Sequence, residues 1–205
     1  MKLQAAIDRV SLERAKEFVR DLDGEADIIE MGTSLTMEFG VRALAPLVEL
    51  SKGTPMLGDI KTMDEGRYEF DTTFESGFTY VTVMGAASDG TIKVCHESTV
   101  EHGGQMMIDL LGCSDERIRE VGIYPDAIYY LHTSIDMPQP DPLEEIRSFK
   151  RRFPHLTRLA ISADGFLDEL PALAAEGVEI LIMGPTIHQA DDPKAACRAV
   201  KAAMR

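Results

Sequence analysis

The sequence has no tryptophan and only 3 cysteines among its 205 residues. Cys95, Cys113 and Cys197 are widely spaced and match no zinc-binding pattern. Because an odd number of cysteines without a framework is typical of reduced thiols, the composition predicts a cytoplasmic protein rather than a disulfide-stabilised one. The 11 methionines are expected to fill gaps in the core.

Positive charge is also scarce, since 21 Lys and Arg residues face 35 Asp and Glu residues, for a formal net charge of −14. This balance argues against partners such as nucleic acid or an anionic membrane surface. It also places any anionic substrate in an unfavourable overall field. A site for such a substrate must therefore create positive potential locally.

Long apolar runs are absent, and none approaches the length that crosses a bilayer. The first 18 residues interrupt their apolar positions with charges, which is not the pattern of a signal peptide. No linker, low-complexity segment or repeat divides the chain. Its length predicts a single domain over residues 1–205.

What the chain does have is an alternation of short apolar runs with longer amphipathic ones. Most of the short runs lack a clean polar–apolar alternation, as expected of parallel strands covered on both faces. The predicted strands are residues 3–8, 27–32, 56–61, 80–85, 106–112, 127–133, 159–165 and 180–186.

Helical patterns lie between these runs, and four of them carry cap or terminator signals. Ser11 is a candidate N-cap, Gly77 is a candidate C-terminal signal, and Asp141 and Asp192 each precede a proline of a first turn. Eight strand–helix units predict a (β/α)8 TIM barrel of the α/β class. An open doubly wound sheet is the alternative. The absence of G-x-G-x-x-G after the first strand argues against a dinucleotide site.

Charged side chains cluster at the carboxyl ends of the predicted strands. In a barrel these ends meet at one mouth, where the catalytic residues of this fold lie. An unpaired carboxylate in an apolar strand costs several kcal/mol, so a functional site explains the set better than helix N-caps alone. The set is Asp8, Glu30, Asp59, Lys61, Asp109, His132 and Asp164.

The stretch DIKTMDEG, residues 59–66, is the most informative of these ends. Asp59 and Lys61 are two residues apart, so their side chains leave the same face of a strand, and Asp64 follows in the loop or first helical turn. A lysine between carboxylates stays protonated, which makes it a fixed cation rather than a Schiff-base nucleophile. A surface ion pair is the simpler alternative.

Glu30 and Asp59 are expected on neighbouring strands. Two carboxylates suit Mg²⁺, which completes its shell with water and substrate oxygens. Such an ion could hold the two oxygens of an enediolate and neutralise their charge. The spacing alone leaves this metal site open.

Together, the runs AID, IIEMGT, DIKTMDEG, YVTVMGAASDGTI, IDLLG and LHTSID resemble the orotidine-phosphate decarboxylase superfamily. The resemblance runs in order along nearly the whole chain. It is strongest to the branch that contains 3-hexulose-6-phosphate synthase and 3-keto-L-gulonate-6-phosphate decarboxylase. The D-x-K-x-x-D motif is a specific signal of this group.

The resemblance implies a barrel that works as a homodimer with shared active sites, uses Mg²⁺ and acts on a small sugar phosphate through an enediolate. It makes Glu30 and Asp59 the metal ligands, Lys61 the electrostatic stabiliser of the intermediate, and Asp64 a residue of the partner's site. Asp109 and His132 would face the reacting carbons, with His132 transferring protons unless it is only a hydrogen-bonded strand-end histidine. The predicted substrate-binding residues are Asp8, Asp59, Thr133, Asp164, Gly165 and Gly184.

Two branches of the resemblance differ after the histidine. The decarboxylases carry an arginine three residues later, where this chain has Ile135. HTSID is nearer to the HTGID of the synthases, which favours the aldol addition of formaldehyde to ribulose 5-phosphate, or its reverse. The decarboxylase and a non-catalytic sugar-binding paralogue remain the alternatives.

The resemblance weakens where the family binds the substrate phosphate, after strands seven and eight. The seventh strand ends in SADG, so Asp164 stands where a small neutral residue is expected, and Pro185 in MGPT has no N–H to donate. Gly165 and Gly184 remain, and Thr186 or His188 could compensate. A shifted phosphate site and a substrate with a different or absent phosphate are both open.

Overall fold

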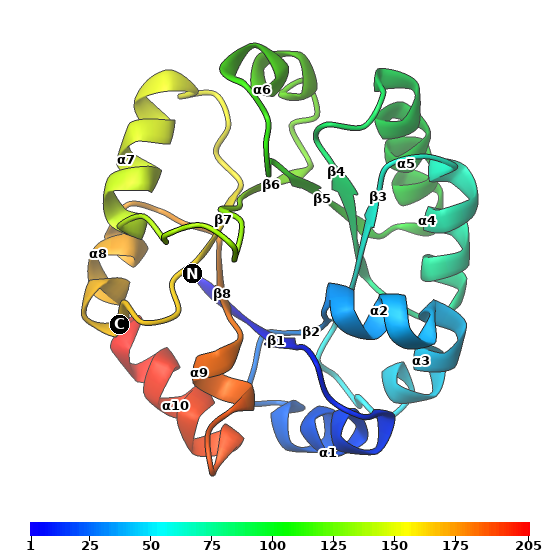
Figure 1. The fold of residues 1–205 in the computed structure, drawn as a ribbon, viewed down its shortest axis with the longest axis vertical. Coiled ribbons are helices and arrows are strands. Elements are labelled where there is room, and N and C mark those ends of the chain that lie inside the picture. The colour runs from blue at the N-terminus through cyan, green and yellow to red at the C-terminus, as the bar shows by residue number, and fades with distance from the viewer.

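The computed structural model describes residues 1–205 and contains a closed barrel of eight parallel strands in sequence order (Figure 1). β1 pairs with β8, with Ala5 opposite Met183, and this pairing closes the sheet. The predicted barrel is confirmed and the open sheet is wrong. The strands are β1 (Lys2–Ile7), β2 (Ile28–Met31), β3 (Met56–Thr62), β4 (Tyr80–Met84), β5 (Gln105–Asp109), β6 (Ile128–Leu131), β7 (Leu159–Ser162) and β8 (Ile180–Met183).

The helices form a ring outside the strands (Figure 1). None of them is long and apolar enough to span a membrane. Two helices, α2 and α3, lie between β2 and β3, and two follow β8. The helices are α1 (Leu12–Leu22), α2 (Thr33–Phe39), α3 (Val41–Val48), α4 (Gly66–Glu75), α5 (Asp89–His102), α6 (Asp115–Val121), α7 (Pro142–Arg152), the 3-10 helix η1 (Leu167–Glu169), α8 (Leu170–Ala175), α9 (Pro185–His188) and α10 (Pro193–Ala203).

The predicted helix caps are present. The Ser11 side chain accepts a hydrogen bond from the Arg14 N–H at the start of α1. Asp141 and Asp192 accept in the same way at the starts of α7 and α10, each directly before a proline. These caps satisfy N–H groups that have no partner within the helix, and they fix where each helix starts after its loop.

The side chains of the strands alternate between two cores. Those pointing outward, such as Leu3, Ala5 and Ile7 of β1, pack beneath the helices. Those pointing inward fill the barrel: Ala6, Ile28, Leu57, Tyr80, Met107, Ile128, Ala160, Ile180 and Ile182. Because strand side chains repeat every two residues, the next inward positions lie nearer the mouth. The next residues in this series include Asp8, Glu30, Asp59, Asp109, Tyr130, Ser162 and Gly184.

Candidate active site

A cavity of about 510 Å³ opens at the carboxyl ends of the strands. Eight of the eleven predicted site residues line it. They come from six strands and the loops that follow them, which is the arrangement expected of a barrel active site. These residues are Asp8, Glu30, Asp59, Lys61, His132, Thr133, Asp164 and Gly184. Of the other predicted residues, Asp109 is fully buried, while Gly165 and Asp64 are exposed.

Lys61 lies between two carboxylates. Its Nζ is 2.7 Å from Oδ2 of Asp59 and 3.2 Å from Oδ2 of Asp109. Burial by itself lowers the pKa of Lys61, but the two carboxylates outweigh it, so the pKa is raised. Lys61 therefore stays charged, as predicted from the sequence.

An irregularity in β3 places both Asp59 and Lys61 at the mouth. Gly58 pairs with Val81 and Thr62 with Val83, so four steps along β3 match two along β4. Lys61 has a φ of 49°, a conformation uncommon for a residue other than glycine. Such bulges redirect side chains next to active sites.

Hydroxyl groups hold this bulge. The Lys61 N–H donates to Oγ1 of Thr82 at 2.9 Å, and the same hydroxyl donates to Oδ1 of Asp59 at 2.8 Å. Thr33 at the start of α2 donates to Oδ2 of Asp59 at 2.5 Å. The Asp59 carboxylate therefore accepts three hydrogen bonds and keeps a fixed orientation.

His132 is positioned from two sides. Its Nδ1 lies 2.7 Å from Oδ2 of Asp109, and its ring stacks on Tyr130 with centroids 4.6 Å apart. Burial would raise the pKa of Asp109, but the hydrogen bond from His132 and the charge of Lys61 outweigh it and the pKa is lowered. The ionised Asp109 favours the tautomer with hydrogen on Nδ1, which leaves Nε2 as the proton-accepting nitrogen.

Glu30 is buried without a cation of its own. Its Oε2 accepts a hydrogen bond from the Gln4 amide at 2.6 Å. Burial and the negative charges of Asp59 and Asp8 raise the pKa of Glu30 to about 8. A divalent cation would relieve this repulsion, so the residues fit the predicted Mg²⁺. No group of three or more His, Cys, Asp or Glu side chains is arranged to hold a metal ion.

Asp8 lies against the start of α2. Its Oδ1 accepts hydrogen bonds from the Ser34 hydroxyl at 2.7 Å and the Ser34 N–H at 3.2 Å. A Cβ at Gly32 would lie 2.3 Å from Oδ2 of Asp8. The position of this carboxylate therefore requires glycine at residue 32.

Asp164 lies in the loop after β7, and its carboxylate contacts the turn between β8 and α9. Its Oδ2 accepts from the Gly184 N–H and its Oδ1 from the Thr186 N–H, both at 2.8 Å. Gly165 follows with a φ of 87°, which favours glycine, and it does not line the cavity. Asp164 thus binds the backbone where the resemblance places a phosphate.

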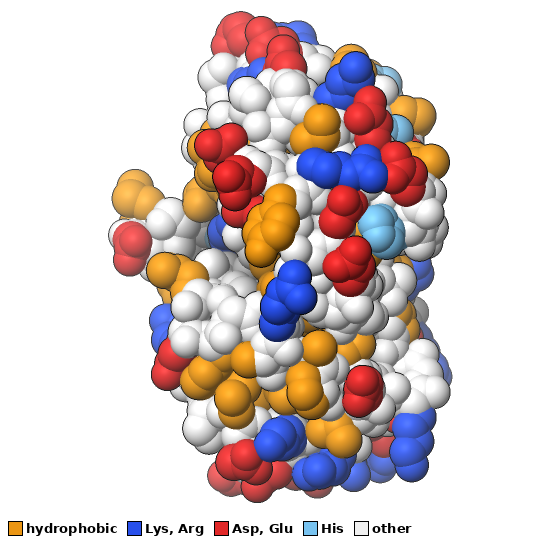
Figure 2. Space-filling model, turned by 90° about the vertical axis from the view of Figure 1, so that its right-hand side faces the viewer, with side chains coloured by type: hydrophobic (Ala, Val, Ile, Leu, Met, Phe, Trp, Pro, Cys, Tyr) orange, Lys and Arg blue, Asp and Glu red, His pale blue; other side chains and the backbone are white.

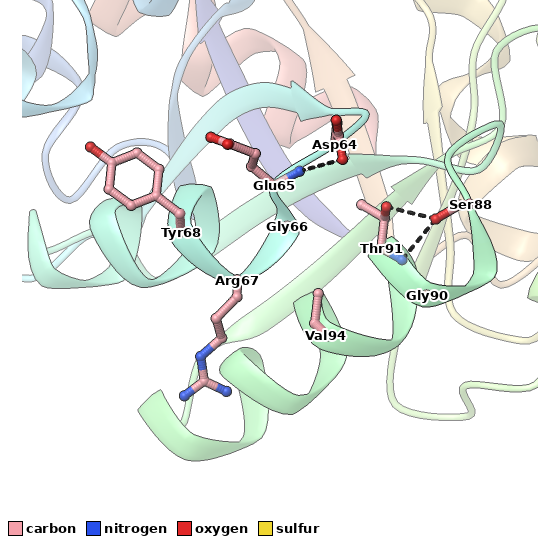
Figure 3. Close-up of a pocket in the computed structure, with 9 residues that line it drawn as sticks. All are labelled: Asp64, Glu65, Gly66, Arg67, Tyr68, Ser88, Gly90, Thr91 and Val94. Atoms are coloured by element: carbon pink, nitrogen blue, oxygen red, sulfur yellow. Dashed lines mark hydrogen bonds between the residues drawn. The ribbon is translucent and has the colours of Figure 1, made fainter.

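Asp64 lies outside the mouth of its own barrel. It lines a separate pocket of about 670 Å³, formed by the start of α4 and the start of α5 (Figure 3). Glu65, Ser88 and Thr91 line the same pocket. The Asp64 carboxylate accepts from the Glu65 N–H at 2.8 Å. The predicted role of Asp64 in a partner's site stays a prediction.

Several polar residues of the mouth were not predicted from the sequence, among them Thr33, Thr82, Tyr130 and Ser162. Thr82, Tyr130 and Ser162 occupy inward positions, and the two-residue period of their strands could have indicated them. The Tyr130 hydroxyl is 2.7 Å from Oγ of Ser162, beside the stacked His132. Thr33 reaches the mouth from a helix, and no strand period indicates it.

Comparison with known proteins agrees with the barrel fold. Residues 1–200 match the family described as Orotidine 5'-phosphate decarboxylase / HUMPS family. The chain belongs to this family. It is 31% identical over 211 residues to the 3-hexulose-6-phosphate synthase of Mycobacterium gastri, with all of both chains covered.

Two solved structures extend the comparison. The 3-hexulose-6-phosphate synthase of Salmonella typhimurium superposes with a TM-score of 0.89 and 27% identity, covering 100% of this chain and 98% of that one. KGPDC from Streptococcus mutans shares the fold, with a TM-score of 0.85 and 22% identity over 99% of this chain and 96% of that one. The curated relatives bear the names of carbon–carbon lyases, which confirms the predicted enzyme class.

Proposed function

We propose that the chain is a metal-dependent aldehyde-lyase of the 3-hexulose-6-phosphate synthase type. It would join formaldehyde to C1 of a ribulose skeleton, or cleave the product. The observation that carries this proposal is the chain of contacts from Asp59 through Lys61 and Asp109 to His132. It places a permanent cation beside a histidine whose second nitrogen can accept a proton.

The proposed reaction begins with His132 Nε2 taking a proton from C1 of the ketose. The C–H electron pair forms a C1–C2 double bond and the ketone oxygen becomes negative, which gives an enediolate. The Lys61 ammonium stabilises this charge. C1 then attacks the aldehyde carbon, and the aldehyde oxygen takes the proton from the His132 imidazolium, which restores the neutral histidine.

Glu30 and Asp59 would hold the magnesium ion, with substrate oxygens and water completing its shell. When bound, the ion supplies positive charge next to the two adjacent oxygens of the substrate. Asp8, fixed by Ser34, would accept hydrogen bonds from substrate hydroxyls.

A homodimer with shared sites is part of the proposal. Seen from the side where α4 and α5 lie, the surface carries hydrophobic side chains grouped in its lower part (Figure 2). Met37, Met63 and Tyr68, from α2, the β3–α4 loop and α4, are 84%, 52% and 62% exposed. Burying such side chains against a second copy would bring Asp64, which lies in the same region, towards the partner's mouth.

The alternatives are less well supported. Ile135 is 69% exposed beside the cavity and cannot deliver a proton, which disfavours the decarboxylase. A sugar-binding paralogue has no need of a buried Lys–Asp–His network, whose charges are expensive to desolvate.

The test is a turnover assay with purified protein, formaldehyde, Mg²⁺ and either ribulose or ribulose 5-phosphate. Consumption of ketose is expected only when the aldehyde and metal are both present, and EDTA should abolish it. If the protein consumes neither ketose, the aldehyde-lyase assignment is refuted.

A further inference from the structure

The distal end of the cavity is formed by the loops after β7 and β8. The backbone amides there, which could otherwise bind an anion, donate to the Asp164 carboxylate. We infer that this end receives an uncharged hydroxyl-bearing terminus, so that the preferred substrate of the proposed lyase is an unphosphorylated ketose. The inference rests on the proposed function for the reaction. The substrate class is inferred from Asp164 and its hydrogen-bond partners.

The backbone donors of the β8–α9 turn are already used. The Gly184 and Thr186 N–H groups both donate to Asp164, and Pro185 between them has no N–H. A phosphate could use these amides only by displacing the carboxylate. The displaced carboxylate would lose its two hydrogen bonds, which costs free energy. It would also lie beside the phosphate and repel it, which is a second cost.

The charges around the cavity also disfavour a dianion. Lys61 is engaged by Asp59 and Asp109, and Nδ1 of His188 lies 3.1 Å from the carbonyl oxygen of Ala6. Arg9 is the remaining cation, and it is exposed and in no ion pair. Against these stand three lining carboxylates that contact neither Lys61 nor the proposed metal ion: Asp8, Glu145 and Asp164. A phosphate would therefore meet mainly negative potential.

A neutral polyol fits the same atoms. Each Asp164 oxygen accepts one backbone hydrogen bond and keeps a second lone pair. Asp164 is half-buried and lines the cavity, so these lone pairs can accept hydrogen bonds from substrate hydroxyls. The two amides hold the carboxylate in place, which makes it a preorganised acceptor.

The test compares ribulose with ribulose 5-phosphate, each with formaldehyde and Mg²⁺. We expect kcat/KM to favour ribulose at least about tenfold, equivalent to about 1.4 kcal/mol. Asp164→Ala should shift the ratio towards the phosphorylated ketose by tenfold or more, because it frees both amides and removes a charge. Asp168→Ala removes a nearby exposed aspartate and should leave the ratio unchanged. A wild-type preference for ribulose 5-phosphate would overturn the inference.

A binding measurement separates this inference from the proposed reaction. Inorganic phosphate is titrated calorimetrically into each protein without Mg²⁺. At millimolar phosphate, Asp164→Ala should bind the ion and the wild type should not. Phosphate binding by the wild type as tight as by the variant would overturn the inference. If neither ketose is consumed, the proposed reaction is refuted, but the phosphate titration still tests the substrate class. If the variant does not fold, the wild-type titration alone tests the substrate class.

Discussion

The two halves of the barrel mouth handle their charges differently. On the side of β3, β5 and β6, Lys61 and His132 contact the carboxylates of Asp59 and Asp109, so opposite charges pair. On the side of β7 and β8, the Asp164 carboxylate binds only backbone amides. The first side carries the residues on which the sequence resemblance rests, and the second is where that resemblance weakens. The comparison suggests that the reaction chemistry and the recognition of the far end of the substrate can change independently.

The largest effect is expected from Lys61→Met on the paired side. It removes the cation that stabilises the developing negative charge and leaves two carboxylates facing each other. We expect kcat to fall about a thousandfold or more, equivalent to roughly 4 kcal/mol of transition-state stabilisation. Steady-state kinetics measure this, and circular dichroism checks the fold.

Lys93→Met is the matched control, since Lys93 is an exposed lysine with only a 3.8 Å contact to Glu97. Its kinetics should match the wild type. An equal loss in both variants, or near-normal turnover of Lys61→Met, would contradict the role given to Lys61.

His132→Gln is expected to lower kcat by a factor of about 100 to 1,000, the range of general acid–base catalysis. Glutamine can still contact Asp109 but cannot accept the proton. His155→Gln changes an exposed histidine away from the mouth and should have no effect on kcat. If His132→Gln raised KM and left kcat unchanged, His132 would be a binding residue only.

Asp64→Asn tests whether a partner completes the paired side. We expect a loss of about 10 to 100-fold in kcat/KM, because the charge would act in the other subunit's site, while the neighbouring Glu65→Gln should have little effect. Mixed dimers of Asp64→Asn with Lys61→Met should regain activity, since one of their two sites would be intact. Mixtures as inactive as the separate variants would refute shared sites.

Gly32→Ala is the mildest change to the mouth. The new methyl group would collide with the Asp8 carboxylate, so KM for the ketose should rise about tenfold with little change in kcat. Gly53→Ala adds a methyl group into open space and serves as the control. If KM rose equally in both variants, Asp8 would not be a substrate-binding residue.

The fold and most of the mouth could be predicted because two simple sequence patterns indicate them. Strand-length apolar runs separated by capped helices indicate the barrel, and charges at their carboxyl ends indicate the mouth. The bulge in β3 could not be predicted, since alternation alone treats Asp59 and Lys61 as an ordinary pair. The contacts of Asp164 were also out of reach, because they depend on amides 20 and 22 residues away.

The buried position of Asp109 shows a further limit. The resemblance implies that Asp109 faces the reacting carbons, whereas the structure puts it, fully buried, behind Lys61 and His132. Its carboxylate orients both groups from beneath. A strand position determines the direction of a side chain, but its depth depends on which neighbouring side chains are longer.

The central claim is that this mouth removes a proton from C1 of a ketose. Nuclear magnetic resonance can follow ribulose and ribulose 5-phosphate in D₂O with the protein and Mg²⁺, in the absence of aldehyde. We expect a C1 hydrogen of at least one ketose to exchange with solvent in the wild type and not in Lys61→Met. Retention of both C1 hydrogens in both ketoses with the wild-type protein would contradict the claim.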